Sequence, residues 1–313
     1  MVNGELRIEL LGPLRVRVGG NTAVFRTDAL RVLLAYLPTH QGQPQRRDTL
    51  AGLLSPDRPD KEALTYLRNR LTRLRQAVGD EAATPPWFEI DRKQIALRVG
   101  DDIFIDVTRF EALLTAVETH PHRQLAGCPT CLAQLAEAVK LVRGEFLAGL
   151  TFPSETWEAW LLAQREHVQQ RTLAGLAWLR EAEMARGNWS AVVELAQREL
   201  AQEPWLEAAH RALMQAHFAL GDRNAALAQY AHCQQVLADE LGVEPEAETV
   251  ALREAIEQNE LLTASRQPAV GNLPAQVGRF IGREREQTEL LRRLAEPHYR
   301  LVTLVGTGGI GKT

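Results

Sequence analysis

Two histidines and two cysteines lie within twelve residues near the middle of this 313-residue sequence, namely His120, His122, Cys128 and Cys131. Imidazole nitrogens and thiolates are the usual ligands of Zn²⁺ in proteins, and C-x-x-C is a common ligand spacing. Pro121 and Gly127 let the backbone bend around an ion. The sequence therefore predicts a structural zinc site with these four residues as ligands.

Two other interpretations of this segment stay open. Pro129 and Thr130 can begin a helix that includes Leu132, with the cysteines as small buried residues. The C-x-x-C pair also fits a redox pair, although no thioredoxin-like strand–helix pattern surrounds it. Cys233 has no such neighbours in sequence, and we expect it to lie in the core.

A phosphate-binding motif stands at residues 306–313, which fit the pattern G-x-x-x-x-G-K-[ST]. Residues 300–305 supply the apolar strand that must precede it. In this motif, backbone N–H groups surround the phosphates, the lysine meets the β- and γ-phosphates, and the last hydroxyl binds Mg²⁺. The residues expected to bind nucleotide are Gly306, Gly308, Gly309, Gly311, Lys312 and Thr313.

The helix that should follow this loop has no counterpart in the sequence, and neither does an acidic partner for Mg²⁺. We therefore expect ATP and Mg²⁺ to bind only in a longer form of the protein, and residues 1–313 to show negligible ATP turnover. The chain itself is not expected to be an enzyme. The alternative to a phosphate loop is a glycine-rich turn without a ligand.

A helix with one basic face is the third candidate site. Residues 60–78 place leucines and a valine on one side, which should pack inward. Residues 61–76 contain five basic residues and one acidic residue. Arg and Asn can bond base edges in the major groove, whereas Thr and flanking Arg reach phosphates. The side chains expected to contact DNA are Thr65, Arg68, Asn69, Arg70, Thr72, Arg73 and Gln76.

A hairpin follows this helix and bears on the same question. Residues 87–90 and 94–97 have the pattern of paired strands, and Arg92 and Lys93 lie at the tip between them. A basic wing of this kind meets the adjacent groove or the backbone, so both residues join the expected DNA contacts. Taken alone, a helix such as 60–78 is more often a solvated amphipathic surface. The hairpin shifts the interpretation toward DNA.

The elements that must position these residues follow from hydrophobic spacing. Residues 6–10 and 14–18 alternate apolar and polar side chains, as half-buried strands do, and residues 23–25 are expected to form a third strand. Helices are expected over 28–37, over a short segment ending at residue 54, and over 60–78. A small antiparallel sheet, three helices and a hairpin are typical of a winged helix, here over residues 1–105.

From residue 106 onward the pattern is almost entirely helical. Two turns, at 187–189 and 221–223, lie 34 residues apart, which is the period of tetratricopeptide (TPR) repeats. His210 and His217 are expected to pack within the repeats or to face solvent. We predict a mainly α protein with an all-α, TPR-like domain over 106–262, a linker over 263–276, and the start of a P-loop α/β domain over 277–313.

The charge of the chain is unevenly distributed. Its net charge of −4 argues weakly against a nucleic-acid binder. Residues 1–110 nevertheless hold 17 Lys and Arg against 14 Asp and Glu, whereas the remainder holds 19 against 26. A basic front is thus joined to an acidic body. No signal peptide and no apolar run of about 18 residues is present, so we expect a soluble, cytoplasmic protein without a membrane partner.

Several motifs resemble those of the SARP/AfsR-type bacterial transcription regulators. Leu-Leu-Gly-Pro-Leu at 10–14, Leu-Leu-Ala-Tyr-Leu at 33–37 and residues 67–75 are similar to their DNA-binding domain. Residues 106–262 resemble their bacterial transcriptional activator domain, down to the segments 141–147 and 240–245. The sequence departs from many relatives at Leu64, where they carry Arg, and at Ser55, where they carry Trp.

The resemblance implies an OmpR-like winged helix that binds double-stranded promoter DNA and helps to recruit RNA polymerase, with a protein partner on the TPR-like domain. Residues 280–284, Phe-Ile-Gly-Arg-Glu, resemble the entry of STAND (NB-ARC-like) ATPase domains. The sequence therefore predicts a transcriptional activator that is coupled, in a longer protein, to a nucleotide-binding switch. The rival hypothesis is a signal-transduction NTPase whose first domains are protein-interaction modules. DNA binding that weakens steeply with salt would separate the two.

Overall fold

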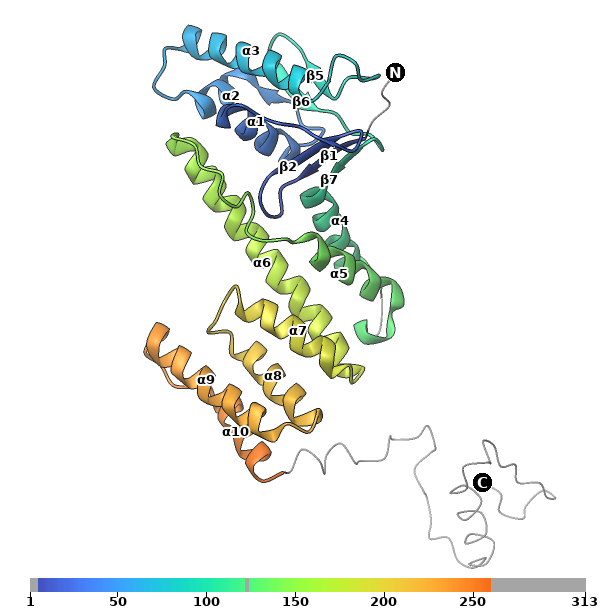
Figure 1. The fold of residues 1–313 in the computed structure, drawn as a ribbon, viewed down its shortest axis with the longest axis vertical. Helices are drawn as coiled ribbons and strands as arrows, with labels where there is room; N and C mark the ends of the chain where they lie inside the picture. Colours follow the sequence, from blue (N-terminus) through green and yellow to red (C-terminus); the bar gives the residue numbers. More distant parts are fainter. Residues whose placement is uncertain (1–4, 122–123, 260–313) are drawn as a thin grey trace, which may run out of the picture. The chain divides into compact units, whose positions relative to one another are not determined.

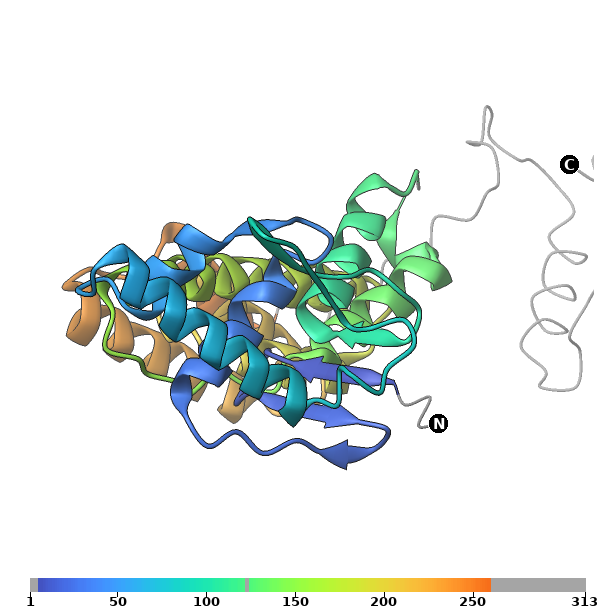
Figure 2. The ribbon, with the colours of Figure 1, turned by 90° about the horizontal axis from the view of Figure 1, so that it is seen from above.

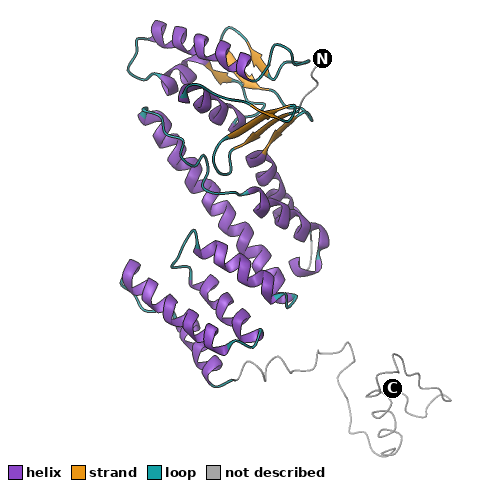
Figure 3. Cartoon of the chain, in the orientation of Figure 1, coloured by secondary structure: helices purple, strands orange, loops and turns teal. Residues whose placement is uncertain are grey.

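The computed structural model describes residues 5–121 and 124–259. A small β region with three helices comes first, and the rest of the described chain is a series of helices (Figures 1 and 3). The expectation of a mainly α fold with a β-containing N-terminal region is therefore confirmed. His122, the linker after residue 262 and the phosphate loop lie outside the described residues.

The first sheet has the strand order β3-β2-β1-β7, with β1 at Leu6–Glu9, β2 at Arg15–Val18, β3 at Asn21–Thr22 and β7 at Ile103–Ile105. Strands β1, β2 and β3 pair antiparallel, as predicted. The prediction of a strand at 23–25 is wrong, because the paired residues of β3 are Asn21 and Thr22 and Val24 is 78% exposed. Strand β7 pairs with β1 in parallel, which the sequence analysis did not foresee.

Three helices and a second sheet complete the β-containing region. The helices are α1 at Asp28–Thr39, α2 at Arg47–Leu54 and α3 at Asp60–Ala77, and all three were predicted. The second sheet has the order β4-β6-β5, with β4 at Gln45–Arg46, β5 at Phe88–Ile90 and β6 at Gln94–Leu97. Helix α3 ends where expected, because Gly79 takes a φ of +66° that a side chain would disfavour.

The helical region begins directly after β7. Its helices are α4 (Asp106–Thr119), α5 (Pro129–Leu141), α6 (Glu155–Ala185), α7 (Trp189–Leu200), α8 (Glu207–Ala219), α9 (Arg223–Leu241) and α10 (Ala247–Glu257), with a short 3₁₀ helix at Leu125–Gly127. Successive helices from α6 to α9 pack against one another. The turns at Gly187 and Gly221 separate α6 from α7 and α8 from α9, as the 34-residue period predicts. Among the described residues, no helix is both long and apolar enough to cross a bilayer.

Buried polar contacts connect neighbouring helices between α6 and α9. Arg180 of α6 and Glu199 of α7 form an ion pair with an Nε–Oε2 distance of 2.7 Å, and Glu199 has no exposed surface. His210 of α8 is also fully buried, and burial lowers its pKa. Its neutral ring donates from Nε2 to the carbonyl of Pro204 at 2.8 Å and accepts at Nδ1 from Gln229 at 2.6 Å. His210 is thus a packing residue, one of the two roles expected for it.

A single hydrophobic cluster runs from the first sheet through the helices of the β-containing region and into α4, α5 and α6. The Tyr36 ring of α1 lies 5.2 Å from the Trp160 ring of α6, and the Phe146 ring lies 6.2 Å from Trp160 on another side. Residues Met1–Leu261 accordingly form one compact unit. The DNA-binding candidates and the helical region therefore share a core.

Candidate nucleic-acid interface

Helix α3 separates an apolar side from a polar side, because leucines recur every three or four residues. Leu67, Leu71 and Leu74 are buried, so the helix can settle on the core in only one orientation. In Figure 2, α3 is the light-blue helix that crosses the face turned toward the viewer. The expected DNA contacts that are exposed on it are Thr65, Arg68, Asn69, Thr72, Arg73 and Gln76.

Two of these side chains are held in place by their own helix. The hydroxyls of Thr65 and Thr72 each donate to the carbonyl four residues earlier, Lys61 at 2.8 Å and Arg68 at 3.1 Å. Both hydroxyl oxygens keep lone pairs, which can accept a hydrogen bond from another group. Arg73 and Asn69 make no hydrogen bond or ion pair within the described residues. Their polar groups are therefore available for a ligand.

Arg70 differs from the other expected contacts, because it is half-buried. Its guanidinium lies 4.4 Å from the centre of the Tyr66 ring, and that of Arg58 lies 4.6 Å from the same ring. Arg75 also turns away from the surface, since its Nε lies 2.6 Å from a carboxylate oxygen of Asp80. Arg58 and Arg75 thus help to set the shape of this helix and its ends.

The hairpin β5–β6 presents the two basic residues predicted at its tip, and both Arg92 and Lys93 are exposed. The Asp91 carboxylate shapes the tip by accepting the backbone N–H of Lys93 at 2.6 Å and of Gln94 at 2.7 Å. These two hydrogen bonds hold the pKa of Asp91 below its ordinary value. Arg47, the first residue of α2, donates to the carbonyl of Asp91 at 3.0 Å and so connects the hairpin tip to α2.

Arg47 and Arg58 were not among the predicted contacts, and both lie outside α3 in the sequence. The Arg46-Arg47 pair before α2 was a visible charge signal. The role of Arg58 was not readable, because it depends on the position of the Tyr66 ring. Both arginines enlarge the basic surface around α3 and the hairpin tip.

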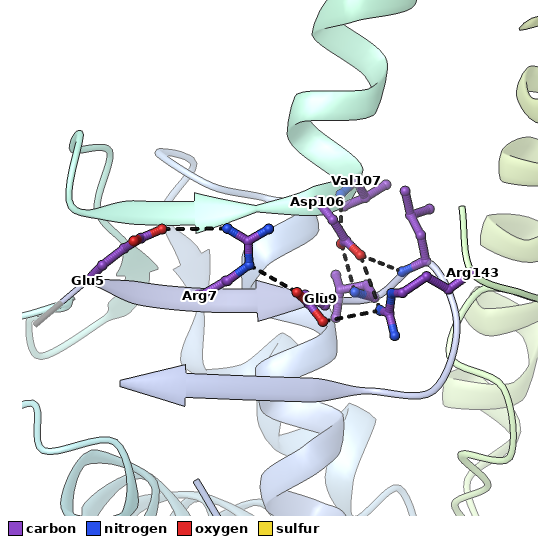
Figure 4. A network of polar contacts seen from close by, with 8 residues as sticks. Glu5, Arg7, Glu9, Asp106, Val107 and Arg143 are labelled. Carbon is purple, nitrogen blue, oxygen red and sulfur yellow. Dashed lines mark hydrogen bonds and ion pairs between the residues drawn. The ribbon is translucent and has the colours of Figure 1, made fainter. Parts of the chain in front are cut away.

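A buried carboxylate joins this region to the helical region (Figure 4). Asp106, the first residue of α4, is 2% exposed and accepts the backbone N–H groups of Leu10 at 2.7 Å, Leu11 at 2.9 Å and Val107 at 2.8 Å. Arg143 reaches the same carboxylate at 3.5 Å and Glu9 of β1 at 3.8 Å. The end of β1 is therefore fastened to the start of α4.

The charge state of Asp106 reflects two opposing effects. Burial raises its pKa, because the low-dielectric interior disfavours the ionised form. The three N–H donors and Arg143 act in the opposite direction, because each stabilises the carboxylate. Burial also acts to raise the pKa of Glu9, but the neighbouring Arg7 and Arg143 outweigh burial, so the pKa of Glu9 is lowered. The network thus combines buried and half-buried charges that depend on one another.

Three of the four residues predicted to bind zinc come together. The Nδ1 atom of His120 lies 3.7 Å from the sulfur of Cys128 and 3.4 Å from that of Cys131. The ligand atoms of the three residues all lie within 4.8 Å of one another. Helix α5 does begin at Pro129, as the helix-cap alternative requires. Both expectations are therefore compatible with the described residues.

The two thiols have different surroundings. Backbone and side-chain hydrogen bonds from Cys131 lower the pKa of Cys128, which is the N-cap residue of α5. Burial raises the pKa of Cys131. Cys233 lies apart in α9, where burial raises its pKa to about 11. Cys233 is a core residue, as expected.

A cavity of about 580 Å³ lies between the loop after α5 and the helices α6 and α7, and its walls include Arg143, Arg165 and Arg198. Arg165 donates to the carbonyls of Phe146 and Leu147, and Arg198 donates to the carbonyl of Val139 at 2.6 Å. Arg165 therefore holds the loop on α6, and Arg198 holds α7 on the end of α5.

The chain is similar to known proteins over most of its length. Residues 105–257 match the family described as bacterial transcriptional activator domain. The chain is 28% identical to the regulatory protein AfsR of Streptomyces coelicolor, over 99% of this chain and 32% of AfsR. It is also 28% identical to the transcriptional regulatory protein EmbR of Mycobacterium tuberculosis, over 85% of this chain and 66% of EmbR.

A solved structure of Mycobacterium tuberculosis EmbR in complex with a low affinity phosphopeptide is similar to this fold, with a TM-score of 0.63 and 25% identity over 82% of this chain and 66% of that one. The chain is thus similar, over these lengths, to a regulatory protein and to a transcriptional regulatory protein. The chain spans about a third of the length of AfsR.

Proposed function

We propose that this chain is the DNA-binding part of a SARP-type transcriptional activator, with α3 in the major groove of promoter DNA and the β5–β6 hairpin on the adjacent backbone. The proposal rests on one observation above others. The exposed side of α3 offers Arg, Asn, Thr and Gln side chains together, and its apolar side is committed to the core. These side chains have the donors and acceptors that read base edges and bind phosphates.

Roles can be divided among these residues by their position. Asn69 and Arg73 extend from the middle of the exposed side and are assigned to base edges. Arg92 and Lys93 are assigned to phosphates, because they are exposed on a separate element, the tip of the β5–β6 hairpin. Arg70 is assigned a supporting role, since it packs over Tyr66.

The experiment is a binding titration on DNA selected from random sequences, repeated over a salt series. We expect affinity to fall steeply with salt, because phosphate contacts release counterions. Arg73→Ala should cost about 1–3 kcal/mol on the selected site and relax its specificity, whereas Lys93→Ala should weaken binding to all sequences and lower the salt slope by about 1.

Lys140→Ala is the matched control, because Lys140 is an exposed lysine of α5 away from the proposed interface. It should leave DNA affinity unchanged. Unaltered specific affinity in Arg73→Ala would contradict the placement of α3. The absence of any salt-dependent DNA binding would instead favour a signalling protein whose first domains bind other proteins.

We further propose that a longer form of the protein carries a nucleotide-binding switch that begins at residues 277–313. The support is the phosphate-loop sequence at 306–313 and the alignment with AfsR, which covers 99% of this chain. Lys312 and Thr313 would contact the phosphates and Mg²⁺. The test is ATP binding by the longer protein, which Lys312→Ala should abolish. ATP binding that survives this substitution would refute the assignment.

We also propose RNA polymerase and a further protein as partners of the helical region. The family resemblance and the match of residues 105–257 to the bacterial transcriptional activator domain support this proposal. Transcription in vitro from a promoter that carries the selected DNA site tests it. Activation should require both the site and this protein, and DNA binding without activation would contradict the polymerase partnership.

A further inference from the structure

We propose that His120, Cys128 and Cys131 bind a Zn²⁺ ion that ties the end of α4 to the start of α5. This site is separate from the proposed DNA interface, and neither its use nor its ligand set follows from DNA binding. The three residues come from two helix ends and meet at one point.

The distances agree with tetrahedral coordination. Bond lengths of about 2.3 Å to sulfur and 2.1 Å to nitrogen place the nitrogen and a sulfur about 3.6 Å apart around one zinc ion. The separations from Nδ1 of His120 are 3.7 Å to Cys128 and 3.4 Å to Cys131. Two sulfurs thus converge on one imidazole nitrogen at the spacing that a shared ion requires.

The donor atoms select the metal. Two thiolates and an imidazole suit Zn²⁺, whereas Mg²⁺ and Ca²⁺ prefer oxygen ligands. The described residues provide three ligands, and zinc in proteins takes four. X-ray absorption on the purified protein counts the sulfur and nitrogen neighbours directly. We expect two sulfur neighbours.

The surrounding backbone explains what the ion would add. His120 is the C-cap of α4, and its N–H donates to the carbonyl of Ala116 at 3.1 Å. Cys131 is buried in the first turn of α5, whereas the intervening 3₁₀ helix Leu125–Gly127 contains no buried residue. Both ligand-bearing ends are therefore anchored, whereas the described part of the connection between them is only partly buried, with Leu125 packed against the core. Metal bonds would fix that connection.

The first test is elemental analysis of the full chain, purified without a polyhistidine tag. We expect about one zinc per chain, as for a structural site. The Cys128→Ser/Cys131→Ser double variant and His120→Ala should each lose it. Cys233→Ala is the matched control, because it removes a cysteine elsewhere in the helical region, and it should retain the zinc.

A second test uses the unaltered protein and so does not depend on how the variants fold. Two thiols should resist modification until a strong chelator is added and then react, while buried Cys233 stays slow. Replacement of zinc by Co²⁺ should give thiolate-to-cobalt charge-transfer absorption and the visible bands of tetrahedral cobalt. Protein without zinc, whose thiols react at the same rate with and without chelator, would overturn the proposal. Such a result would leave thiol–imidazole hydrogen bonding as the reason for the cluster.

Discussion

Removal of the Asp106 carboxylate is the perturbation whose cost can best be worked out from the structure. This side chain accepts three backbone N–H groups at 2.7 to 2.9 Å and is 2% exposed. A buried N–H group left without a partner costs about 1–3 kcal/mol. The summed cost for three such groups is an upper limit, because water entry and local relaxation reduce it. We expect Asp106→Ala to lower the free energy of unfolding by about 3–5 kcal/mol.

Asp106→Asn should cost less than Asp106→Ala, because its amide retains one acceptor oxygen but turns an NH₂ group toward an N–H donor. The control is Asp101→Ala, an exposed aspartate five residues earlier with no hydrogen bond or ion pair among the described residues. A surface change of this kind stays within about 0.5 kcal/mol.

The assay is urea unfolding of the full chain, followed in parallel by circular dichroism and by tryptophan fluorescence. Coincident transitions would justify a single free energy. Trp157 and Trp160, with ring centres 4.9 Å apart, belong to the hydrophobic core that the β-containing region and α6 share, so fluorescence reports on the unfolding of that core. A loss below about 1 kcal/mol in Asp106→Ala, or one equal to that of Asp101→Ala, would refute the view that the carboxylate stabilises the joint.

Three further predictions follow from buried or strained positions. Burial lowers the pKa of His210, so on acidification the unfolded state takes up a proton before the folded state does. The free energy of unfolding should therefore fall as pH drops below about 6.5. Urea titrations of a His210→Gln variant should lack this fall. Burial raises the pKa of Cys233 from 9.0 to about 11, so the thiol ionises first in the unfolded state and the free energy of unfolding should fall as pH rises above about 9. An equal fall in a Cys233→Ala variant would contradict this. Gly12 and Gly20 both have a positive φ, but a Cβ at Gly12 would lie 3.2 Å from the Cβ of Arg143, whereas one at Gly20 meets nothing within 4 Å. Gly12→Ala should therefore lower the melting temperature more than Gly20→Ala. Equal losses would show that crowding at Arg143 does not matter.

The elements that the sequence predicted well are those with long, local patterns. Helix α3 could be placed because Leu67, Leu71 and Leu74 repeat at the helical period and Gly79 ends it. Strand β7 could not, since three residues carry little periodicity and its partner is β1, at the other end of the β-containing region. The strand expected at 23–25 failed for a related reason. The three residues are all apolar, so they carry no alternation that marks where a short strand begins or ends, and the paired residues of β3 are Asn21 and Thr22 instead.

The candidate sites follow the same division. The Cys128–Cys131 pair and His120 were readable because they lie close together in sequence, and the structure brings their ligand atoms together. The exposed side of α3 was readable for the same reason. The part played by Asp106 was not, because an acidic residue in the first turn of a helix looks like an ordinary interaction with the helix dipole. Its partners Leu10 and Leu11 lie in the turn after β1, about 95 residues earlier in the sequence, so local sequence patterns do not indicate the contact.

The joint at Asp106 bears on how the proposed DNA interface is supported. The sequence pattern changes from alternating to helical between residues 105 and 106, but packing continues across that point. The carboxylate of Asp106 holds the end of β1, and Tyr36 of α1 rests against Trp160 of α6. Helix α1 also contacts α3, so α3 is positioned in part by residues of the helical region. A variant that loosens this joint would therefore alter the support of the proposed DNA-binding helix without changing any residue on its exposed side.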